Sequence, residues 1–437
     1  MTRAILILAV FLWVALFTAP PTAEAQEARA RWERMCQIRA EKFDLVMPGA
    51  MTANDLDMWI VVMREGLLDP LWEALGRGYV TDWAYYVFTR KGDRVERAAL
   101  GVGGYRLEEC GVYDHFGGKD ELPDYVAERD PQRIGVNMAE AIGGADGLSH
   151  TSYLHLRDIL GEYGNRLVSA ERFVSDFRST RTAIEIAAFA EAGEISREIA
   201  DRAFSNEVIT PGVTTLEDVA WWMSDQQLRR GLESSFDMPS VYVTGPDGIA
   251  AVSSDRIIQR GDLLMIDWGV GFLDFYTDMK RIAYVLREGE TEAPAGLQNA
   301  FDQAVKVRNI MKRTIRPAAT AQIALDRTWE AIEAAGFNRV GFNQPTEDPG
   351  VTDVVLGPHS VGNWGHGIGP SLAFFNPKQL TFELRPGTLI SIELFAYTAH
   401  PGWNNAKVRI PLEDDAVVTE RGVEWLYPVA DRILLIK

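Results

Sequence analysis

The segment 263–281, LLMIDWGVGFLDFYTDMKR, places single carboxylates inside apolar runs that favour β-strands. Asp267 interrupts the first run, a glycine-containing turn follows, and Asp278 lies on the predicted return strand. If these acids oppose each other, the turn centres near Phe272 and Leu273 and about 5 Å separates them. Two like charges so placed destabilise a hairpin unless a positive charge lies between them. The alternative, one turn residue and one surface charge, is disfavoured because a lone carboxylate in the apolar surroundings of Asp267 is costly.

Two further acids and one histidine extend this pattern. Glu393 interrupts LISIELFAY, Glu413 begins EDDAVV, and His366 stands between glycines in NWGHGIG. A Gly-His-Gly segment can also be a tight turn with its imidazole in solvent. Four carboxylates and a neutral imidazole carry a charge of about −4, which two divalent cations would neutralise, and this ligand set suits Mn, Fe, Co or Zn. The sequence therefore predicts a site for two divalent metal ions.

The length and charge of the chain limit its organisation and its partners. A chain of 437 residues favours two domains with a large core. The formal net charge of −18 argues against nucleic acid and anionic membrane surfaces as partners, because phosphate binding needs clustered lysine and arginine.

The first 25 residues are typical of a secretory signal peptide. They combine a basic start at Arg3, a short apolar run, and the small residues Ala23 and Ala25 before Gln26. A membrane anchor is the alternative, but the apolar run is short for a span and ends in two prolines. We therefore expect an exported protein, periplasmic or secreted, that does not associate with a membrane after signal cleavage. Cys36 and Cys110 could pair in such an oxidising compartment, or remain free.

The rest of the chain divides into two parts by its pattern. Residues 26–170 alternate helical and strand patterns, with a hairpin signal KGD between YYVFTR and VERAALGV, and predict a smaller α/β domain. Residues 171–437 predict an α+β domain: a long helix from about residue 178, a capping box formed by Thr215 and Asp218, and many strands after Ser240. Two helices near residues 296–315 and 321–335 interrupt these strands, and we expect the helices to lie on one side.

The order of these residues resembles the pita-bread metallopeptidase family. The shared features are an Asp, a second Asp eleven residues later, Gly-His-Gly-Ile-Gly, a Glu in an Ile-Glu strand, and a late Glu before Val-Val-Thr. The family includes Xaa-Pro aminopeptidases, prolidases, methionine aminopeptidases and creatinase. The resemblance covers about residues 178–426, and residues 26–170 look like the creatinase-type N-terminal domain. It implies an α+β fold with a C-terminal pita-bread catalytic domain.

The resemblance also implies a role for each candidate ligand. Asp267 would chelate the first metal ion, and Asp278 would bridge the two ions. His366 and Glu393 would bind the second ion, and Glu413 would bridge again. Glu393 would also transfer protons. RIPLEDDAVVT has two more residues after Ile410 than the family pattern, and alignment from the C-terminal side selects Glu413 as the ligand.

Two family histidines that are not metal ligands are absent from this chain. They hold the substrate carbonyl and the tetrahedral intermediate, and Ala250 and Ala373 stand in their places. His359 or His400 could supply the missing donors, unless they are simply a loop histidine and a solvent histidine. Arg409 matches a family arginine that lines the pocket; as a surface ion-pair partner it would contribute little.

These features predict an exported dinuclear-metal hydrolase that cleaves an amide bond by a metal-bridged hydroxide, on Xaa-Pro-like peptides. The alternatives are a non-peptidase reaction on the same scaffold, either small-molecule C–N hydrolysis or a lyase reaction, and a peptide-binding module without turnover. The expected partners are a peptide or small amide substrate and, by family analogy, a second copy in a homodimer.

Overall fold

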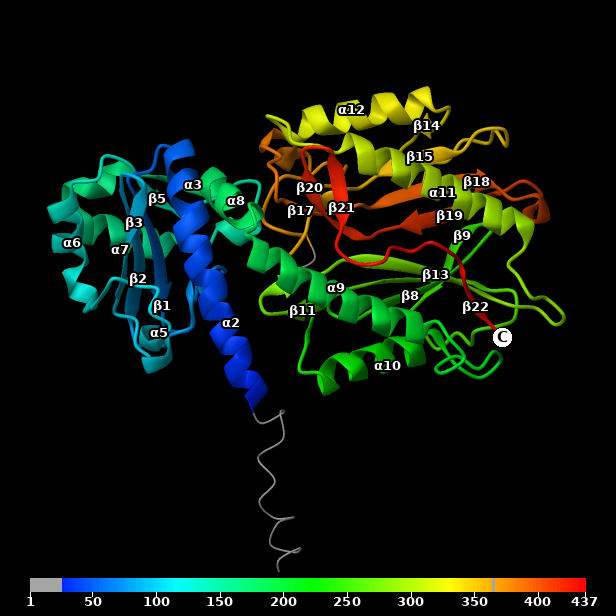
Figure 1. The fold of residues 1–437 in the computed structure, drawn as a ribbon, viewed down its shortest axis with the longest axis horizontal. Helices are drawn as coiled ribbons and strands as arrows, with labels where there is room; N and C mark the ends of the chain where they lie inside the picture. Colours follow the sequence, from blue (N-terminus) through cyan, green and yellow to red (C-terminus); the bar gives the residue numbers. More distant parts are fainter. Residues whose placement is uncertain (1–25, 364–365) are drawn as a thin grey trace, which may run out of the picture.

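The computed structural model describes residues 26–363 and 366–437. The predicted signal peptide, residues 1–25, lies outside these described residues. Within the described ranges, no helix is long and apolar enough to cross a membrane. The chain forms two lobes, an N-terminal one drawn in blue to cyan and a C-terminal one drawn in green to red (Figure 1). The domain boundary near residue 170 stays a prediction, although α8 and α9 connect the lobes close to it.

The N-terminal lobe is built on one six-stranded sheet with the order β4-β3-β2-β1-β5-β6. β1, β2 and β3 are antiparallel neighbours, and the outer strands pair in parallel. The predicted hairpin is confirmed, with Lys91 opposite Arg94. The strands are β1 (Met58–Arg64), β2 (Trp83–Lys91), β3 (Arg94–Leu100), β4 (His115–Gly117), β5 (Ile134–Val136) and β6 (Leu167–Ser169).

Helices cover both faces of this sheet because successive residues of its strands point to opposite sides. Trp59 packs with the helices on one face, and Ile60 packs with those on the other. The first group is α2 (Glu27–Glu41), the π-helix η2 (Lys42–Val46), α3 (Met47–Ala53) and α8 (Glu171–Ser179), and the second is α6 (Leu122–Arg129) and α7 (His150–Leu160). Two short helices, α4 (Trp72–Leu75) and α5 (Tyr105–Glu109), lie in connections. Cys36 in α2 and Cys110 after α5 form a disulfide with their Cα atoms 5.3 Å apart.

The C-terminal lobe contains a five-stranded sheet, β22-β13-β10-β8-β9, two four-stranded sheets, β14-β15-β18-β19 and β16-β17-β20-β21, and a small sheet, β12-β11-β7. The first strands are β7 (Glu233–Ser234), β8 (Ser240–Gly245), β9 (Gly248–Val252), β10 (Leu263–Trp268), β11 (Val270–Phe272), β12 (Phe275–Tyr276) and β13 (Met279–Val285). The later strands are β14 (Asn338–Arg339), β15 (Asp353–Leu356), β16 (His359–Ser360), β17 (Leu389–Ser391), β18 (Leu394–Ala399), β19 (Lys407–Leu412), β20 (Asp415–Thr419), β21 (Gly422–Trp425) and β22 (Leu434–Ile436).

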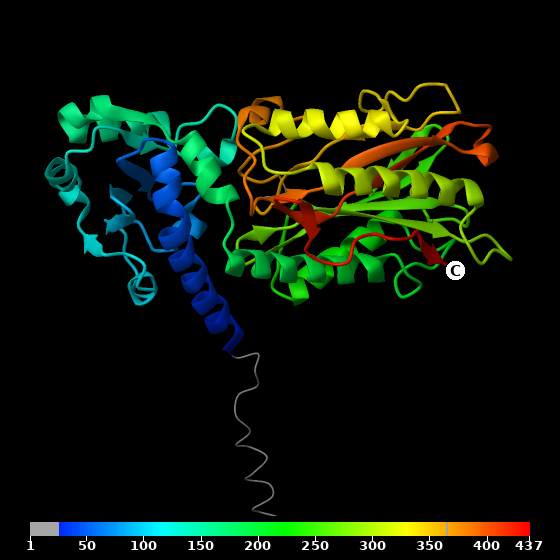
Figure 2. The ribbon, with the colours of Figure 1, turned by 45° about the horizontal axis from the view of Figure 1, so that its top comes forward.

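Helices lie on two sides of these strands, so the expectation of helices on one side is wrong (Figure 2). α9 (Ala183–Ala203) and α10 (Leu216–Arg229) form one layer, and α11 (Ala295–Thr314) and α12 (Ala321–Ala334) form the other. The run LLMI in β10 is apolar at every position because Leu264 and Ile266 pack on the first layer while Leu263 and Met265 pack toward the second. The predicted capping box of Thr215 and Asp218 begins α10.

Candidate metal centre and substrate cavity

A cavity of about 330 Å³ in the C-terminal lobe collects the predicted acids. Asp267 lies in β10, Asp278 precedes β13, Glu393 connects β17 to β18, and Glu413 follows β19. Phenylalanine rings line the cavity beside these acids: Phe236, Phe342, Phe374, Phe375 and Phe395. The structure thus brings four carboxylates from different strands to one place, and their role as metal ligands stays a prediction.

The predicted pairing of Asp267 with Asp278 is wrong, because Asp267 lies opposite Lys280. The turn centres on Leu273 and Asp274, one residue later than predicted. Both residues have positive φ angles, 53° and 61°, as a two-residue hairpin turn with a type I′ backbone requires. Moving the centre of a turn by one residue moves every cross-strand partner by two.

Lys280 supplies the positive charge that this cluster needs. Its Nζ donates to Glu393 Oε1 at 2.8 Å and also to Glu413 Oε2, and lies 3.2 Å from Asp267 Oδ2. Burial alone would lower the pKa of Lys280, but the surrounding carboxylates outweigh burial and hold that pKa well above its ordinary value. Lys280 was not among the residues predicted from the sequence. Its signal was its position two residues after Asp278 on a predicted strand, which puts both side chains on the same face.

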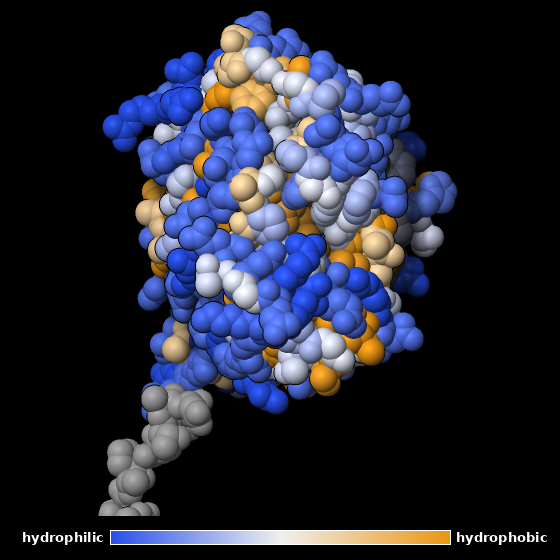
Figure 3. Space-filling model, turned by 90° about the vertical axis from the view of Figure 1, so that its right-hand side faces the viewer, coloured by the Kyte–Doolittle hydropathy of each residue, from blue (hydrophilic) through white to orange (hydrophobic). Residues whose placement is uncertain are grey.

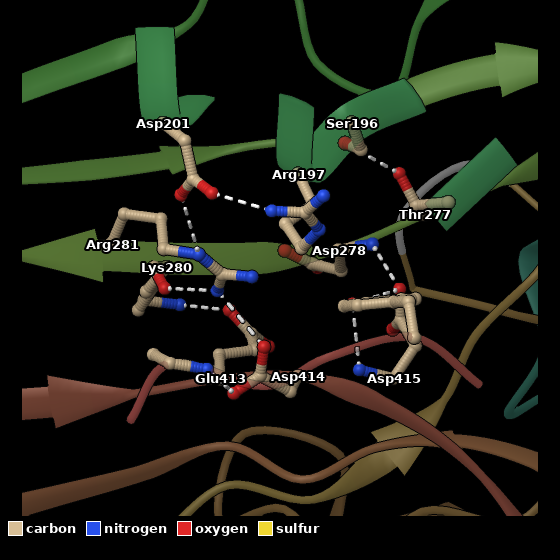
Figure 4. Close-up of polar contacts among 12 residues, drawn as sticks. Ser196, Arg197, Asp201, Thr277, Asp278, Lys280, Arg281, Glu413, Asp414 and Asp415 are labelled. Atoms are coloured by element: carbon tan, nitrogen blue, oxygen red, sulfur yellow. Dashed lines mark hydrogen bonds and ion pairs between the residues drawn. The ribbon is translucent and has the colours of Figure 1, made fainter. Parts of the chain in front are cut away.

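Glu413, the acid that alignment from the C-terminal side selects, contacts both Lys280 and His359. It is fully buried, and its Oε1 accepts a hydrogen bond from the Ser391 hydroxyl at 2.6 Å. Burial opposes ionisation of Glu413, but Lys280 outweighs it and holds the pKa of this carboxyl below its usual range. The two following acids have other partners, as Figure 4 shows: Asp414 accepts from Arg281 at 2.9 Å, and Asp415 accepts from the Asp278 backbone N–H at 3.2 Å.

Asp278 and His359 face each other with atoms that lack hydrogen-bond partners. Asp278 Oδ1 and His359 Nε2 are both buried and unpartnered among the described residues, and His359 Nε2 lies 3.8 Å from Asp278 Oδ2 and 3.4 Å from Glu413 Oε1. Burial and the nearby charge of Glu413 raise the pKa of Asp278 well above its ordinary value. Burial alone would lower the pKa of His359, but Glu413 outweighs it and raises that pKa. Two buried acceptors without hydrogen-bond partners, beside the carboxylate of Glu413, indicate a position for a cation.

His366 lies at the exposed edge of this group. Its ring centroid is 4.5 Å from that of His359 and 4.9 Å from that of Phe375, on which it stacks. Asp278, His359 and His366 each offer a ligand atom, and these atoms lie within 4.8 Å of one another, as a metal ion would require. His359, predicted as a substrate donor, therefore lies among the candidate ligands. His366 is not simply a solvent-facing turn residue.

The remaining predicted residues differ in their positions. Arg409 in β19 lines the cavity and lies over the Phe395 ring, 4.4 Å from its centroid. His400 does not reach the cavity lining, because it stacks on Trp403 at 5.0 Å; the suggestion that it replaces a missing donor is wrong. Ala373 is fully buried, and Ala250 lies exposed on β9. Neither alanine side chain can donate a hydrogen bond.

The helix-flanked sheets and their buried carboxylates agree with the fold and the acid cluster that the sequence resemblance implies. The model of metallopeptidase family M24 matches residues 187–420, more than half of the chain. The chain therefore belongs to family M24, as the sequence resemblance predicts.

Relatives of this chain carry peptidase names. The chain is 26% identical over 273 residues to the uncharacterized peptidase YqhT of Bacillus subtilis, and 24% identical over 263 residues to the Xaa-Pro dipeptidase of Pyrococcus furiosus. These matches cover 59% and 58% of this chain, and only 64% of the length of each relative.

Solved structures share the fold across both lobes. An X-Pro aminopeptidase from Thermotoga maritima has a TM-score of 0.63 at 16% identity, covering 89% of this chain and 99% of that one. An Xaa-Pro dipeptidase from Bacillus anthracis has a TM-score of 0.62 at 18% identity, covering 92% and 99%. Both parts of the predicted fold, the pita-bread domain and the smaller domain before it, are confirmed by this likeness.

Proposed function

We propose that this chain is a metal-dependent hydrolase that cleaves an amide bond, with Xaa-Pro-like peptides as its substrate class. One observation carries the proposal: four acids and two histidines converge in a cavity walled by aromatic rings, in a chain of family M24. The names of the relatives favour the same substrate class. The expected metal is Mn, Co, Zn or Fe, because oxygen and imidazole ligands suit these ions.

The donor set fits a divalent ion, because Asp278, His359 and His366 offer ligand atoms within 4.8 Å of one another. Asp278 Oδ1 and His359 Nε2 are also buried without a hydrogen-bond partner among the described residues. When bound, such an ion lowers the pKa of water and polarises a carbonyl. Glu393 is the group that would accept a proton and return it to the leaving amine. Its burial raises its pKa to about 7, against the opposing effect of Lys280, so at neutral pH it could both accept and donate a proton.

The walls of the cavity suit an apolar, partly charged substrate. Phe342 and Phe374 stack at 5.2 Å between ring centroids, and both are exposed toward solvent. A proline ring would bury apolar surface against such rings. Arg409 would bind a carbonyl or carboxylate of the substrate, since its Nε has no partner among the described residues.

The absence of donors at Ala250 and Ala373 favours a slow peptidase or a shifted substrate. Losing one preorganised oxyanion donor typically lowers kcat by about 10²–10³-fold. We therefore keep small-molecule amide hydrolysis as the second candidate, and we expect kcat/KM for ordinary Xaa-Pro peptides below about 10⁴ M⁻¹s⁻¹. The peptide-binding module and the lyase stay alternatives without a structural observation in their favour.

Metal-reconstituted protein should be assayed on matched pairs such as Ala-Pro and Ala-Ala, and on acyl amides without a peptide bond. We expect slow cleavage that prefers proline. Cleavage of the acyl amides alone would favour the second candidate. If no substrate of either kind is cleaved with any of the four metals, the hydrolase proposal fails.

We also propose that the protein is exported, because the residues before Gln26 match a signal peptide and Cys36 and Cys110 form a disulfide. N-terminal sequencing of protein from the native host should begin at Gln26. A start at Met1 or Thr2 would contradict export by cleavage. The homodimer stays a prediction.

A further inference from the structure

Lys280 occupies a position that a divalent cation would need. A lysine ammonium has three N–H donors. Here three different carboxylates, those of Asp267, Glu393 and Glu413, surround one Nζ. The ammonium therefore offsets part of the negative charge in the half of the cluster that contains Asp267, and it holds these carboxylates together.

A metal ion and this ammonium compete for the same space. A divalent ion lies about 2.0–2.2 Å from carboxylate oxygens, whereas Lys280 Nζ lies 2.8 Å from Glu393 Oε1 and 3.2 Å from Asp267 Oδ2. An ion bound by the same oxygens would lie within the van der Waals radius of the ammonium, and the two positive charges would repel. Lys280 is held in a strand whose residues are all buried, so its side chain has little room to withdraw.

The other half of the cluster, which contains Asp278 and His359, is not hydrogen-bonded to the ammonium. Lys280 makes no hydrogen bond to Asp278, and within the described residues Asp278 Oδ1 and His359 Nε2 have no hydrogen-bond partner, although His359 Nε2 lies 3.4 Å from Glu413 Oε1. The carbonyl of Ser360 lies 3.1 Å from His359 Nδ1. A proton on Nδ1 leaves Nε2 as a lone pair that faces the carboxylates of Asp278 and Glu413. Acceptors that face one another need a cation between them.

We infer that Lys280 replaces one of the two predicted cations, and that the chain binds a single divalent ion through Asp278, His359 and His366. This inference deepens the proposed function and rests on it for the identity of the ligand as a metal. It corrects the predicted ligand set in two ways. His359 becomes a ligand, and Asp267, Glu393 and Glu413 bind an ammonium in place of a second ion.

The stoichiometry of Mn²⁺ tests the inference directly. Protein stripped with chelator and titrated with Mn²⁺ alone should bind one ion per chain, by calorimetry and by elemental analysis after gel filtration. Its electron paramagnetic resonance spectrum should be that of an isolated Mn²⁺, without the exchange coupling of a metal pair. Two tightly bound ions in the wild type would overturn the inference.

Two variants test the roles of the two halves of the cluster independently. Lys280→Met keeps the length of the side chain and removes its charge, so the Mn²⁺ count should rise from one to two. His359→Ala should raise the Mn²⁺ Kd by more than about tenfold, the loss typical even of residues that only orient a ligand. An unchanged Kd in His359→Ala would overturn the assigned ligand set.

Lys407→Met is the matched control for the loss of a buried lysine. Lys407 is also buried and pairs with Asp353 at 2.5 Å, but it does not line the cavity. The Lys407→Met variant should still bind one Mn²⁺ ion per chain. A rise in both lysine variants would mean that the extra ion binds nonspecifically, and would overturn the role of Lys280.

These outcomes are distinct from those that test the hydrolase. Two ions with amide hydrolysis would overturn the inference and leave the proposed function standing. One ion without hydrolysis of any substrate would support the inference and overturn the function. No bound ion would overturn both.

Discussion

At the scale of single residues, Lys280 shows how strongly one position of a turn determines a site. The sequence pattern predicts a turn at Phe272 and Leu273, whereas the turn lies at Leu273 and Asp274. Neither Leu273 nor Asp274 is a glycine, so the sequence carries no strong signal for two successive positive φ angles. The four acids could be predicted because each interrupts an apolar run. The partner of Asp267 could not, because it depends on the register.

Glu393→Gln should abolish turnover without unfolding the protein. Glutamine keeps the size of the side chain but cannot accept a proton, so we expect kcat to fall by at least about 10²-fold, the usual contribution of a general acid–base group. Glu424→Gln, on the exposed face of β21, is the control and should change kcat little. Circular dichroism should show the same fold for both variants. Near wild-type kcat in Glu393→Gln would mean that this residue has only a structural role.

At the scale of elements, local sequence patterns predict the long amphipathic helices and the first hairpin. They do not predict on which side of the sheets the helices lie. A helix pattern shows which face of the helix is buried, but not against which side of a sheet it packs. The fully apolar run of β10 was the available signal, because a strand that is apolar on both faces needs cover on both sides. The position of the His400 side chain could not be predicted from local patterns either, because only the fold shows that it stacks on Trp403.

The disulfide between Cys36 and Cys110 ties α2 to the end of α5 across a sequence separation of 74 residues. In the chain-entropy model, a loop of this length contributes about 4 kcal/mol to the free energy of unfolding. We expect Cys36→Ser with Cys110→Ser to lower that free energy by about this amount, measured by urea unfolding. Dithiothreitol should destabilise the wild type similarly and leave the double variant unchanged. An equal response of both proteins to the reductant would exclude the disulfide as its cause.

At the scale of the whole molecule, the lobes meet through apolar side chains, such as Ile38 of α2 and Phe189 of α9, and through charged groups of two kinds. Glu185 at the start of α9 is buried, and it accepts hydrogen bonds from Lys42 of η2 at 2.8 Å and from Arg181 at 2.9 Å. Glu191, further along α9, pairs with Arg34 of α2 at 2.5 Å on the surface. By contrast, the free end of the C-terminal lobe presents mainly hydrophilic side chains with apolar ones in small groups (Figure 3). Of the two charged contacts, the buried one should contribute more to the stability of the junction, because a surface ion pair contributes little.

Glu185 should make that stability depend on pH. Burial alone would raise its pKa, but Lys42 and Arg181 outweigh burial and lower the pKa to about 2. Because the unfolded carboxyl has a pKa near 4.5, its stabilising effect is fully present above pH 4.5 and is lost as the pH falls toward 2. Glu185→Gln should therefore lower the free energy of unfolding by about 3 kcal/mol at pH 7, and by progressively less below pH 4.5. Urea unfolding from pH 7 to pH 3 measures this difference.

Glu191→Gln is the matched control on the same helix. Because a surface ion pair contributes at most about 1 kcal/mol, this variant should lose little free energy of unfolding at any pH. A Glu185→Gln deficit that stayed constant down to pH 3 would show that the charge of Glu185 is not what holds the lobes together.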